Sequence, residues 1–103
     1  MEKFDKIKAH KDLYDCFSKI DNPEDIEKLL ADLCTFNEVE QMAQRLHCAK
    51  LLLQGCTYNK IIELTDISSA TLSRVSRCLR HGSGGYSKVV KKLVDEENGS
   101  SDK

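Results

Sequence analysis

Hydroxyl-bearing and cationic side chains occur together in one short stretch, ISSATLSRVSRCLRHG, at residues 67–82. Small or hydroxyl-bearing residues crowd its beginning: Ser68, Ser69, Ala70, Thr71 and Ser73. Side chains of this kind let a helix approach a groove of nucleic acid, and the N-terminus of a helix favours phosphate. These five residues are therefore our candidates for contact with the base edges of DNA.

Arginines follow them at three-residue steps. Each step turns a side chain by about 60° around a helix, so the arginines form a slanting basic ridge. A guanidinium group is always charged and suits phosphate oxygens, and phosphate contacts position a protein without specifying a sequence. The candidates for phosphate contact are Lys60, Arg74, Arg77, Arg80 and Lys88.

Charge is distributed unevenly along the chain, although its 103 residues carry a net charge of only -1. Residues 57–94 hold 7 basic and 2 acidic side chains, a net charge of +5, whereas 1–56 and 95–103 each have a net charge of -3. A basic excess around a hydroxyl-rich helix favours a nucleic-acid partner. The alternative is a solvated helix face, since such a face also tolerates this many charges.

Residues 57–80 have the spacing of a helix-turn-helix. They predict one helix over 57–65, a tight turn at Asp66 and a second helix over 68–79. Four apolar residues stand where the two helices must contact each other: Ile61, Ile67, Leu72 and Val75. Asp66 occupies a turn position that usually has glycine, because the backbone there tends to need a positive φ, and Asp tolerates that region better than most residues.

The rest of the chain also predicts helices. Apolar residues at helical steps indicate a helix over 4–20, and Asn22 and Pro23 then cap and start a second one. Thr35 and Glu38 have the spacing of a capping box and open a third, longest helix. A short terminal helix follows the stretch HGSGGY. Because the sequence has no β-alternation and no hairpin dipeptide, it predicts an all-α fold.

A chain of this length forms one small domain, which we place at residues 1–97, with the helix-turn-helix inside it. Residues 98–103 are polar and acidic and are expected to be a disordered tail. The stretch HGSGGY lacks the spacing and the preceding strand of a phosphate-binding loop. No apolar run approaches the roughly 20 residues that a bilayer requires, and MEKFDKIK lacks the apolar core of a secretory signal. We therefore expect a cytoplasmic protein without membrane contact.

The cysteines and histidines form no recognisable catalytic or metal-binding pattern. The cysteines are odd in number and irregularly spaced: Cys16, Cys34, Cys48, Cys56 and Cys78. Without a C-x-x-C pair they are expected to be reduced and buried, with a redox sensor as the alternative. His10, His47 and His81 lie in three segments and lack a neighbouring nucleophile and acid. The sequence therefore predicts no catalytic residue, no metal site and no enzymatic activity.

Four runs of residues resemble the tryptophan repressor superfamily and are most similar to its Trp-repressor-related branch of YerC/YecD type. They are LCTFNEVEQMAQRL, LLLQG, TYNKIIE and SSATLSRVSRCLRHGSGGY, within residues 29–94. The resemblance implies six helices and an intertwined homodimer that presents two helix-turn-helix units to double-stranded DNA. Independently, the first three predicted helices carry more apolar residues than one small core covers, which also favours a dimer. A palindromic operator with half-sites about one helical turn apart is then expected.

The resemblance also implies a candidate effector pocket. In tryptophan-binding members two arginines sandwich the indole ring, and Arg45 and Arg74 match them here, while Thr35 matches a threonine that contacts the ligand. Val75, however, stands in place of a glycine, and Cys78 replaces a serine that meets the amino group of the ligand. The valine crowds the pocket and a thiol is the weaker hydrogen-bonding group, which argues against tryptophan and leaves another small effector or none. The alternative role of both arginines is structural, in salt bridges to carboxylates.

The sequence is compatible with two functions. The leading hypothesis is a dimeric, sequence-specific DNA-binding transcriptional regulator, and a repressor, because so small a chain has no room for a separate activation module. The alternative is a helix-turn-helix interaction module that binds a protein or RNA. Duplex binding that weakens steeply with salt separates the two hypotheses, since phosphate neutralisation produces that dependence. No cofactor is expected in either case.

Overall fold

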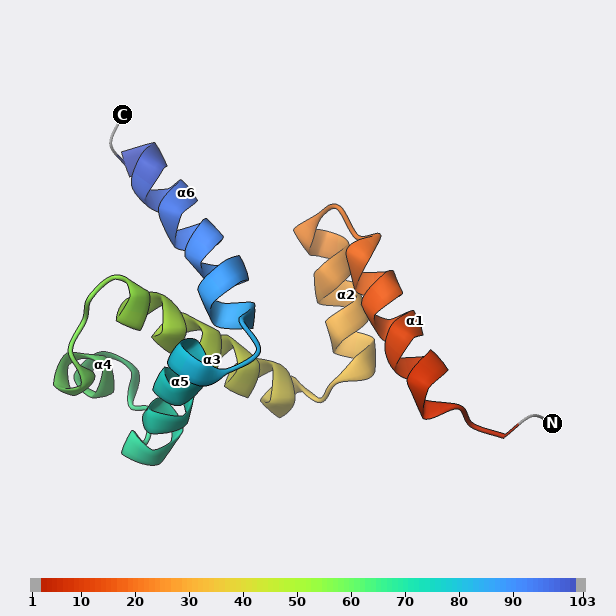
Figure 1. Ribbon diagram of the computed structural model, residues 1–103, viewed down its shortest axis with the longest axis horizontal. Helices are drawn as coiled ribbons and strands as arrows, with labels where there is room; N and C mark the ends of the chain where they lie inside the picture. Colours follow the sequence, from red (N-terminus) through yellow and green to blue (C-terminus); the bar gives the residue numbers. More distant parts are fainter. Residues whose placement is uncertain (1–2, 102–103) are drawn as a thin grey trace. The chain divides into compact units, whose positions relative to one another are not determined.

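The computed structural model describes residues 3–101, and over this range the chain is all-α, as the sequence predicts. Six α-helices and one π-helix, η1, are present, and the described residues form no strand (Figure 1). The elements are α1 (Lys6–Ser18), α2 (Pro23–Leu33), α3 (Phe36–Leu53), α4 (Tyr58–Thr65), α5 (Ser69–His81), η1 (Tyr86–Val90) and α6 (Lys91–Ser101). They group into two compact units, Met1–Val39 and Glu40–Lys103, whereas one domain over 1–97 is expected from the sequence.

Local capping signals set the beginnings of α1 and α2. Asp5 Oδ1 accepts a hydrogen bond from the Lys8 N–H at 3.1 Å and thereby caps α1. Asn22 Oδ1 accepts from the Asp25 N–H at 2.8 Å, and Pro23 takes the first helical position of α2. Both contacts satisfy amide groups that the first turn of a helix leaves without a partner. The predicted start of the second helix is confirmed.

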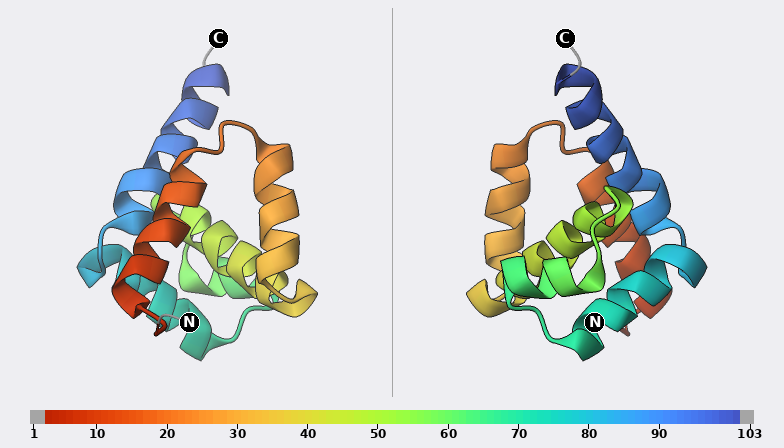
Figure 2. Two further views of the ribbon diagram at one scale, coloured as in Figure 1. Left: turned by 90° about the vertical axis from the view of Figure 1, so that its right-hand side faces the viewer. Right: turned by 90° about the vertical axis from the view of Figure 1, so that its left-hand side faces the viewer.

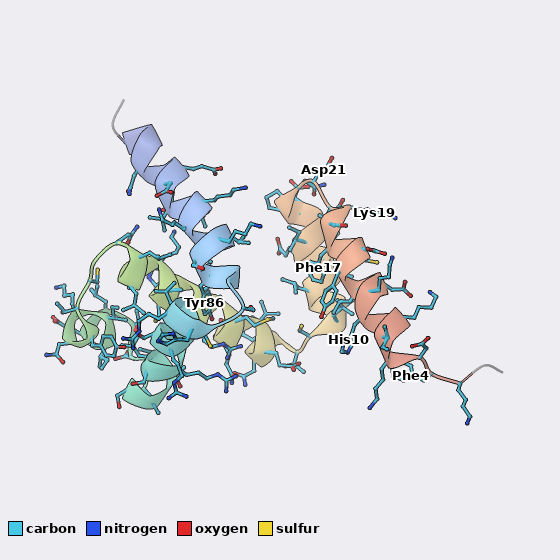
Figure 3. All side chains as sticks on the ribbon, in the orientation of Figure 1. Phe4, His10, Phe17, Lys19, Asp21 and Tyr86 are labelled. Atoms are coloured by element: carbon cyan, nitrogen blue, oxygen red, sulfur yellow. The ribbon has the colours of Figure 1, made fainter. Side chains whose placement is uncertain are left out.

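Among the described residues of the first unit, none is buried. No residue of α1 or α2 is buried, and every buried hydrophobic residue belongs to the second unit. Phe4 precedes α1, and Phe17, which is half-buried, lies near its end (Figure 3). The exposed large apolar residues of this unit are Phe4, Ile7, Leu13, Tyr14, Ile26, Leu33 and Phe36. The apolar stripes that predict these helices therefore remain largely exposed in the first unit.

A reciprocal capping box opens α3, as the sequence predicts. The Thr35 N–H donates to Glu38 Oε1 at 2.8 Å, and the Glu38 N–H donates to Thr35 Oγ1 at 3.1 Å. The bond from the Thr35 backbone, assisted by the Thr35 side chain, lowers the pKa of the Glu38 carboxyl below its ordinary value. The carboxylate is thus held in its ionised form at the positive end of the helix.

Helices α3, α4 and α5 lie close together (Figure 2), and residues from all three share one hydrophobic core in the second unit. Cys48 enters it from α3, Ile61 from α4, Ile67 from the loop and Leu72 from α5. The half-buried residues packed against this cluster are Leu51, Leu52, Cys56 and Ile62. Val75 is buried as well, so all four apolar residues predicted to hold the helix-turn-helix together lie in the interior.

Two glycines shape the connection from α5 to η1. A Cβ atom at Gly82 would collide with the carbonyl oxygen of Cys78, so the chain can turn away from α5 here because the residue has no side chain. Gly84 has a φ of 97°, a conformation that side chains with a Cβ rarely adopt. Its carbonyl accepts from the Lys88 N–H at 2.8 Å and leads into η1.

The last helix is longer than predicted. α6 runs to Ser101 and so includes residues 98–101 of the tail that is expected to be disordered; residues 102–103 lie outside the described range. The Lys50 ammonium contacts Glu97 Oε1 at 2.9 Å and joins α3 to the middle of α6, while Val94 is buried. These contacts fasten α6 well beyond its first turn, so its polar end continues an already formed helix.

All five cysteines are free thiols in the structure, but they differ in exposure. Cys48 is buried, Cys34, Cys56 and Cys78 are half-buried, and Cys16 is exposed. The expectation of buried thiols is therefore wrong for Cys16, because α1, which carries it, buries no residue.

Candidate nucleic-acid interface

Helices α4 and α5 form the helix-turn-helix that the spacing predicts (Figure 2). Thr57 Oγ1 caps α4 by accepting from the Lys60 N–H at 3.2 Å. Asp66 ends α4 in the left-handed conformation, with a φ of 58° and a ψ of 16°, and its N–H donates to the Ile62 carbonyl at 3.0 Å. It has the only positive φ of a non-glycine residue in the described range. Aspartate thus takes the role that glycine usually has in this turn.

Ser68 caps α5 and is joined to Thr71 by two hydrogen bonds. Its Oγ accepts from the Thr71 N–H at 3.1 Å and donates to Thr71 Oγ1 at 2.8 Å. The hydroxyl of Ser68 therefore serves the helix itself. Thr71 accepts the serine proton and still has its own proton to donate to a partner.

The outer face of α5 carries the candidate base-contacting residues. Leu72, Val75 and Ser76 turn inward and are buried. Ser68, Ser69, Ala70 and Ser73 are exposed, and Thr71 is half-buried. Small and hydroxyl-bearing side chains thus occupy the solvent side of the first two turns, where a recognition helix contacts base edges.

The candidate phosphate-contacting side chains are all exposed: Lys60, Arg74, Arg77, Arg80 and Lys88. Within the described part of the chain, none of them forms a salt bridge with a carboxylate. Arg80 Nε donates to the carbonyl of Ser76, one turn back, at 3.5 Å. Their positive charges are therefore not neutralised by neighbouring side chains and can meet phosphate.

Salt bridges occur elsewhere in the structure, on other cations. The pairs are Lys8–Asp12, Lys11–Asp15, Lys50–Glu97 and Lys91–Asp95. Arg45 and Arg74 take part in none of those found among residues 3–101. No salt bridge within the described residues supports the alternative in which carboxylates hold these two arginines.

Three of the four residues expected in an effector pocket line one cavity of about 420 Å³. They are Arg45 from α3 and Arg74 and Cys78 from α5, joined in the lining by Thr71, Val75 and Tyr86. Thr35 belongs to the first unit, where it caps α3. Tyr86, at the start of η1 (Figure 3), was not predicted from the sequence, since its position depends on the turn through the preceding glycines.

Gln44 and Thr65 are further residues of this region that the sequence does not single out. Gln44 Nε2 on α3 donates to the Thr65 carbonyl at the end of α4 at 3.2 Å. Gln44 also lines a polar hollow of about 290 Å³ together with Arg45, Asp66 and Ser68. A hydrogen bond between residues 21 positions apart leaves no periodic signal in the sequence.

No group of three or more His, Cys, Asp or Glu side chains in the described range could hold a metal ion. None of the helices described is long and apolar enough to cross a membrane.

The arrangement defines an all-α helix-turn-helix protein with an exposed hydroxyl-rich helix and unpaired cations beside it. The family described as Trp repressor protein matches residues 8–94. The chain belongs to the Trp repressor family, which indicates a helix-turn-helix DNA-binding regulator.

Similar proteins come from several bacteria. The uncharacterized protein YerC of Bacillus subtilis (strain 168) is 40% identical over 100 residues, which cover 97% of this chain and 86% of YerC. The crystal structure of a TrpR like protein from Eubacterium eligens ATCC 27750 is 35% identical, with a TM-score of 0.79, and the match covers 85% of this chain and 91% of that one. A structure from Staphylococcus aureus is 36% identical, with a TM-score of 0.78 and coverage of 84% and 86%. The fold and the family are thus shared with YerC-type proteins.

Proposed function

We propose that the chain is a cytoplasmic, sequence-specific transcriptional repressor that binds a palindromic operator as a homodimer. The observation that carries this proposal is the outer face of α5. There Ser69, Ala70 and Ser73 are exposed while Leu72 and Val75 anchor the opposite face in the core. Such a helix can enter the major groove without disturbing the fold that supports it.

In this proposal, hydroxyls and cations have separate roles. Thr71 and Ser73 donate to or accept from base edges, and Ala70 offers an apolar contact to a thymine methyl group. Arg74, Arg77 and the other exposed cations contact phosphates and set the register of the helix on the duplex. The absence of carboxylate partners in the described range supports this role, because a salt bridge would have to be broken before phosphate could bind.

The homodimer is supported by the exposed apolar residues of the first unit. Phe36 is 80% exposed and Ile7 is 85% exposed, and neither α1 nor α2 buries a residue. Large apolar side chains left in water on this scale are unfavourable in a monomer, and a second copy of the chain is the partner that we propose. Two α5 helices related by a two-fold axis then face half-sites about 34–36 Å apart.

In this proposal the protein does not need tryptophan as an effector for binding to its operator. Val75 lines the cavity beside Arg45 and Arg74 and is 1% exposed, so its side chain fills space within the wall. Cys78 offers a thiol in the same wall, and a thiol is a weak hydrogen-bonding group. The protein then binds its operator either without an effector or with a different small molecule.

Selection from a pool of randomised palindromic duplexes, followed by anisotropy across a salt series, tests this function. The expected result is enrichment of a two-fold motif with half-sites one helical turn apart, bound with a steep salt dependence. Weak binding that salt abolishes, without enrichment of any motif, would contradict operator binding without an effector. That result would leave two explanations: a missing effector, or a helix-turn-helix that serves a protein or RNA partner.

A further inference from the structure

Thr65, the last residue of α4, connects three segments of the second unit through one hydroxyl. Its Oγ1 donates to the Ile61 carbonyl at 2.7 Å, accepts from the Ile67 N–H at 3.3 Å and accepts from the Cys48 thiol at 3.8 Å. A hydroxyl has one proton and two lone pairs, so these contacts use its full capacity. The single oxygen atom thus joins α3, α4 and the loop before α5.

A second contact holds the same residue through its backbone. Gln44 Nε2 on α3 donates to the Thr65 carbonyl at 3.2 Å, and both residues are half-buried. Helix α3 therefore reaches Thr65 from two positions one turn apart, Gln44 and Cys48. The end of α4 is fixed to α3 at both its backbone and its side chain.

The next residue in the chain needs this support. Asp66 has a φ of 58°, and a non-glycine residue keeps a left-handed conformation only where its surroundings hold it there. On one side, the Asp66 N–H bonds to the Ile62 carbonyl at 3.0 Å. On the other side, the Ile67 N–H bonds to Thr65 Oγ1. The hydroxyl of Thr65 thus closes the turn from which α5 departs.

We propose that Thr65 is a positioning residue for DNA recognition: its hydroxyl closes the turn, Gln44 holds its backbone carbonyl, and together they fix the direction of α5. This inference rests on the DNA-binding function proposed above. Hydrogen bonds from Thr71 and Ser73 to base edges require good distances and angles, whereas long cationic side chains adjust to phosphates after a small rotation of the helix. Loss of the Thr65 hydroxyl therefore lowers discrimination between duplexes more than it lowers overall affinity.

The test compares Thr65→Val, which keeps the shape but loses the hydroxyl, with Thr65→Ser, which keeps the hydroxyl. The probes are the palindromic duplex that the unmodified protein enriches from a randomised pool and a shuffled duplex of the same composition. We expect Thr65→Val to lower the ratio of the two affinities about tenfold, the scale of one lost base-pair contact, and Thr65→Ser to stay within about twofold. An unchanged ratio in folded Thr65→Val protein would overturn the inference.

Two further variants distinguish the positioning role of Thr65 from a purely structural role. Thr57→Ala removes the cap at the other end of α4 and lowers stability without touching the turn, so its affinity ratio should stay unchanged. Gln44→Met removes the brace at similar size, and it should lower the ratio even if Thr65→Val does not fold. Equal losses of discrimination in Thr57→Ala and in the turn variants would overturn the positioning role.

Amide exchange distinguishes failure of this inference from failure of the proposed function. If the unmodified protein enriches no duplex, the DNA-binding function fails and the positioning role fails with it. Exchange of the Ile67 N–H still reports the brace itself: protection in the unmodified protein that Thr65→Val removes is the expected result. An Ile67 N–H that exchanges freely in the unmodified protein would overturn the inference while leaving the DNA-binding function intact.

Discussion

The hydroxyl oxygens of Ser68 and Thr71 lie 2.8 Å apart at the beginning of α5, with Ser68 as the donor. The same serine oxygen accepts from the Thr71 N–H at 3.1 Å, so both of its contacts are made within the first turn of the helix. Ser68 is therefore the cap of α5, although it was a candidate for base contact. Thr71 is held in place by this cap and is the hydroxyl of the pair with a proton left to donate outward.

Thr71→Ala should change which base is preferred at one position of each half-site. Loss of the hydroxyl removes a contact to a base edge, and such contacts discriminate by about 1–3 kcal/mol. Selection on randomised duplexes with the variant should relax or shift the motif at that position. Ser18→Ala, which alters an exposed hydroxyl of the first unit, is the control and should leave the motif unchanged. Weakening of all duplexes alike by Thr71→Ala would assign the hydroxyl to a phosphate instead.

Arg77→Ala should weaken binding to every duplex by a similar factor. Arg77 is exposed and has no carboxylate partner in the described range, so its charge is available to one phosphate. Loss of one phosphate contact lowers the slope of log affinity against log salt by about 0.9. Lys11→Ala is a matched control, because Lys11 is paired with Asp15 at 2.7 Å and its removal should not alter the slope. A changed base preference in Arg77→Ala would contradict the assignment to phosphate.

The sequence was informative wherever one short stretch determines the structure. Asn22 and Pro23 define the start of α2, and the reciprocal bonds of Thr35 and Glu38 define the start of α3, because both signals lie within one helical turn. The apolar spacing around the turn predicted the buried residues of the helix-turn-helix for a similar reason. The left-handed conformation of Asp66 also followed from its place in that motif.

Contacts between distant segments were not predictable in this way. The brace from Gln44 to Thr65 spans 21 positions, and a glutamine at a half-buried site has no distinctive spacing. The exposure of Cys16 was not predicted. An apolar stripe indicates that one face of a helix packs against something, but it does not show whether that packing comes from the same chain, and α1 buries no residue within this chain. The contact of Lys50 on α3 with Glu97 on α6 likewise joins residues far apart in the sequence and leaves no periodic signal.

Asp66→Gly should stabilise the protein by about 0.5 kcal/mol. A left-handed conformation costs an L-residue about 1–2 kcal/mol, and glycine avoids that cost but loses about 0.4–1 kcal/mol through the greater entropy of its unfolded chain. Urea denaturation at neutral pH measures the difference. Asp66→Val should instead destabilise the protein by about 1 kcal/mol or more, since a β-branched residue tolerates a positive φ poorly. Equal stabilities of the two variants would argue against the φ of 58°.

The capping box of α3 should make part of the stability depend on pH. The pKa of Glu38 is lowered in the folded protein, so its contribution to stability is present above the ordinary value of 4.5 and is lost as the pH falls through the lower, folded value. Glu38→Gln should remove this part of the acid sensitivity, as seen in urea midpoints between neutral pH and pH below 4.5. Glu40→Gln, on the same helix but outside the capping box, is the control.

Thr35→Ala tests the other half of the same capping box. The alanine removes the oxygen that accepts from the Glu38 N–H at 3.1 Å, which should destabilise the protein by about 1 kcal/mol. In this variant the pKa of Glu38 should move back toward its ordinary value, although the backbone N–H of Thr35 still reaches the carboxylate. An unchanged stability at neutral pH would contradict the capping role of Thr35.

Tryptophan should not bind the unmodified protein measurably in calorimetry at ligand concentrations up to about 1 mM, a limit that corresponds to about -4 kcal/mol. Val75 and Cys78 are the reason, because both line the cavity beside Arg45 and Arg74. The double variant Val75→Gly, Cys78→Ser enlarges the cavity and replaces the thiol with a hydroxyl. Circular dichroism must first establish that this variant is folded, since a glycine within α5 costs about 1 kcal/mol before the lost packing is counted.

The folded double variant is then titrated with tryptophan. If binding heat appears, and adding Arg45→Ala abolishes it, the side chains of Val75 and Cys78 are the barrier to binding. Heat released by the unmodified protein and removed by Arg45→Ala would contradict the expectation and make tryptophan the effector. If neither protein releases heat with tryptophan, we would assign the exclusion of tryptophan to other residues that line the cavity. Tyr86 is then the first candidate, because it lines the cavity with Thr71 and Val75. In that case Tyr86→Phe, which keeps the ring and removes its hydroxyl, is the next variant, and a gain of indole binding in it would locate the barrier at that hydroxyl.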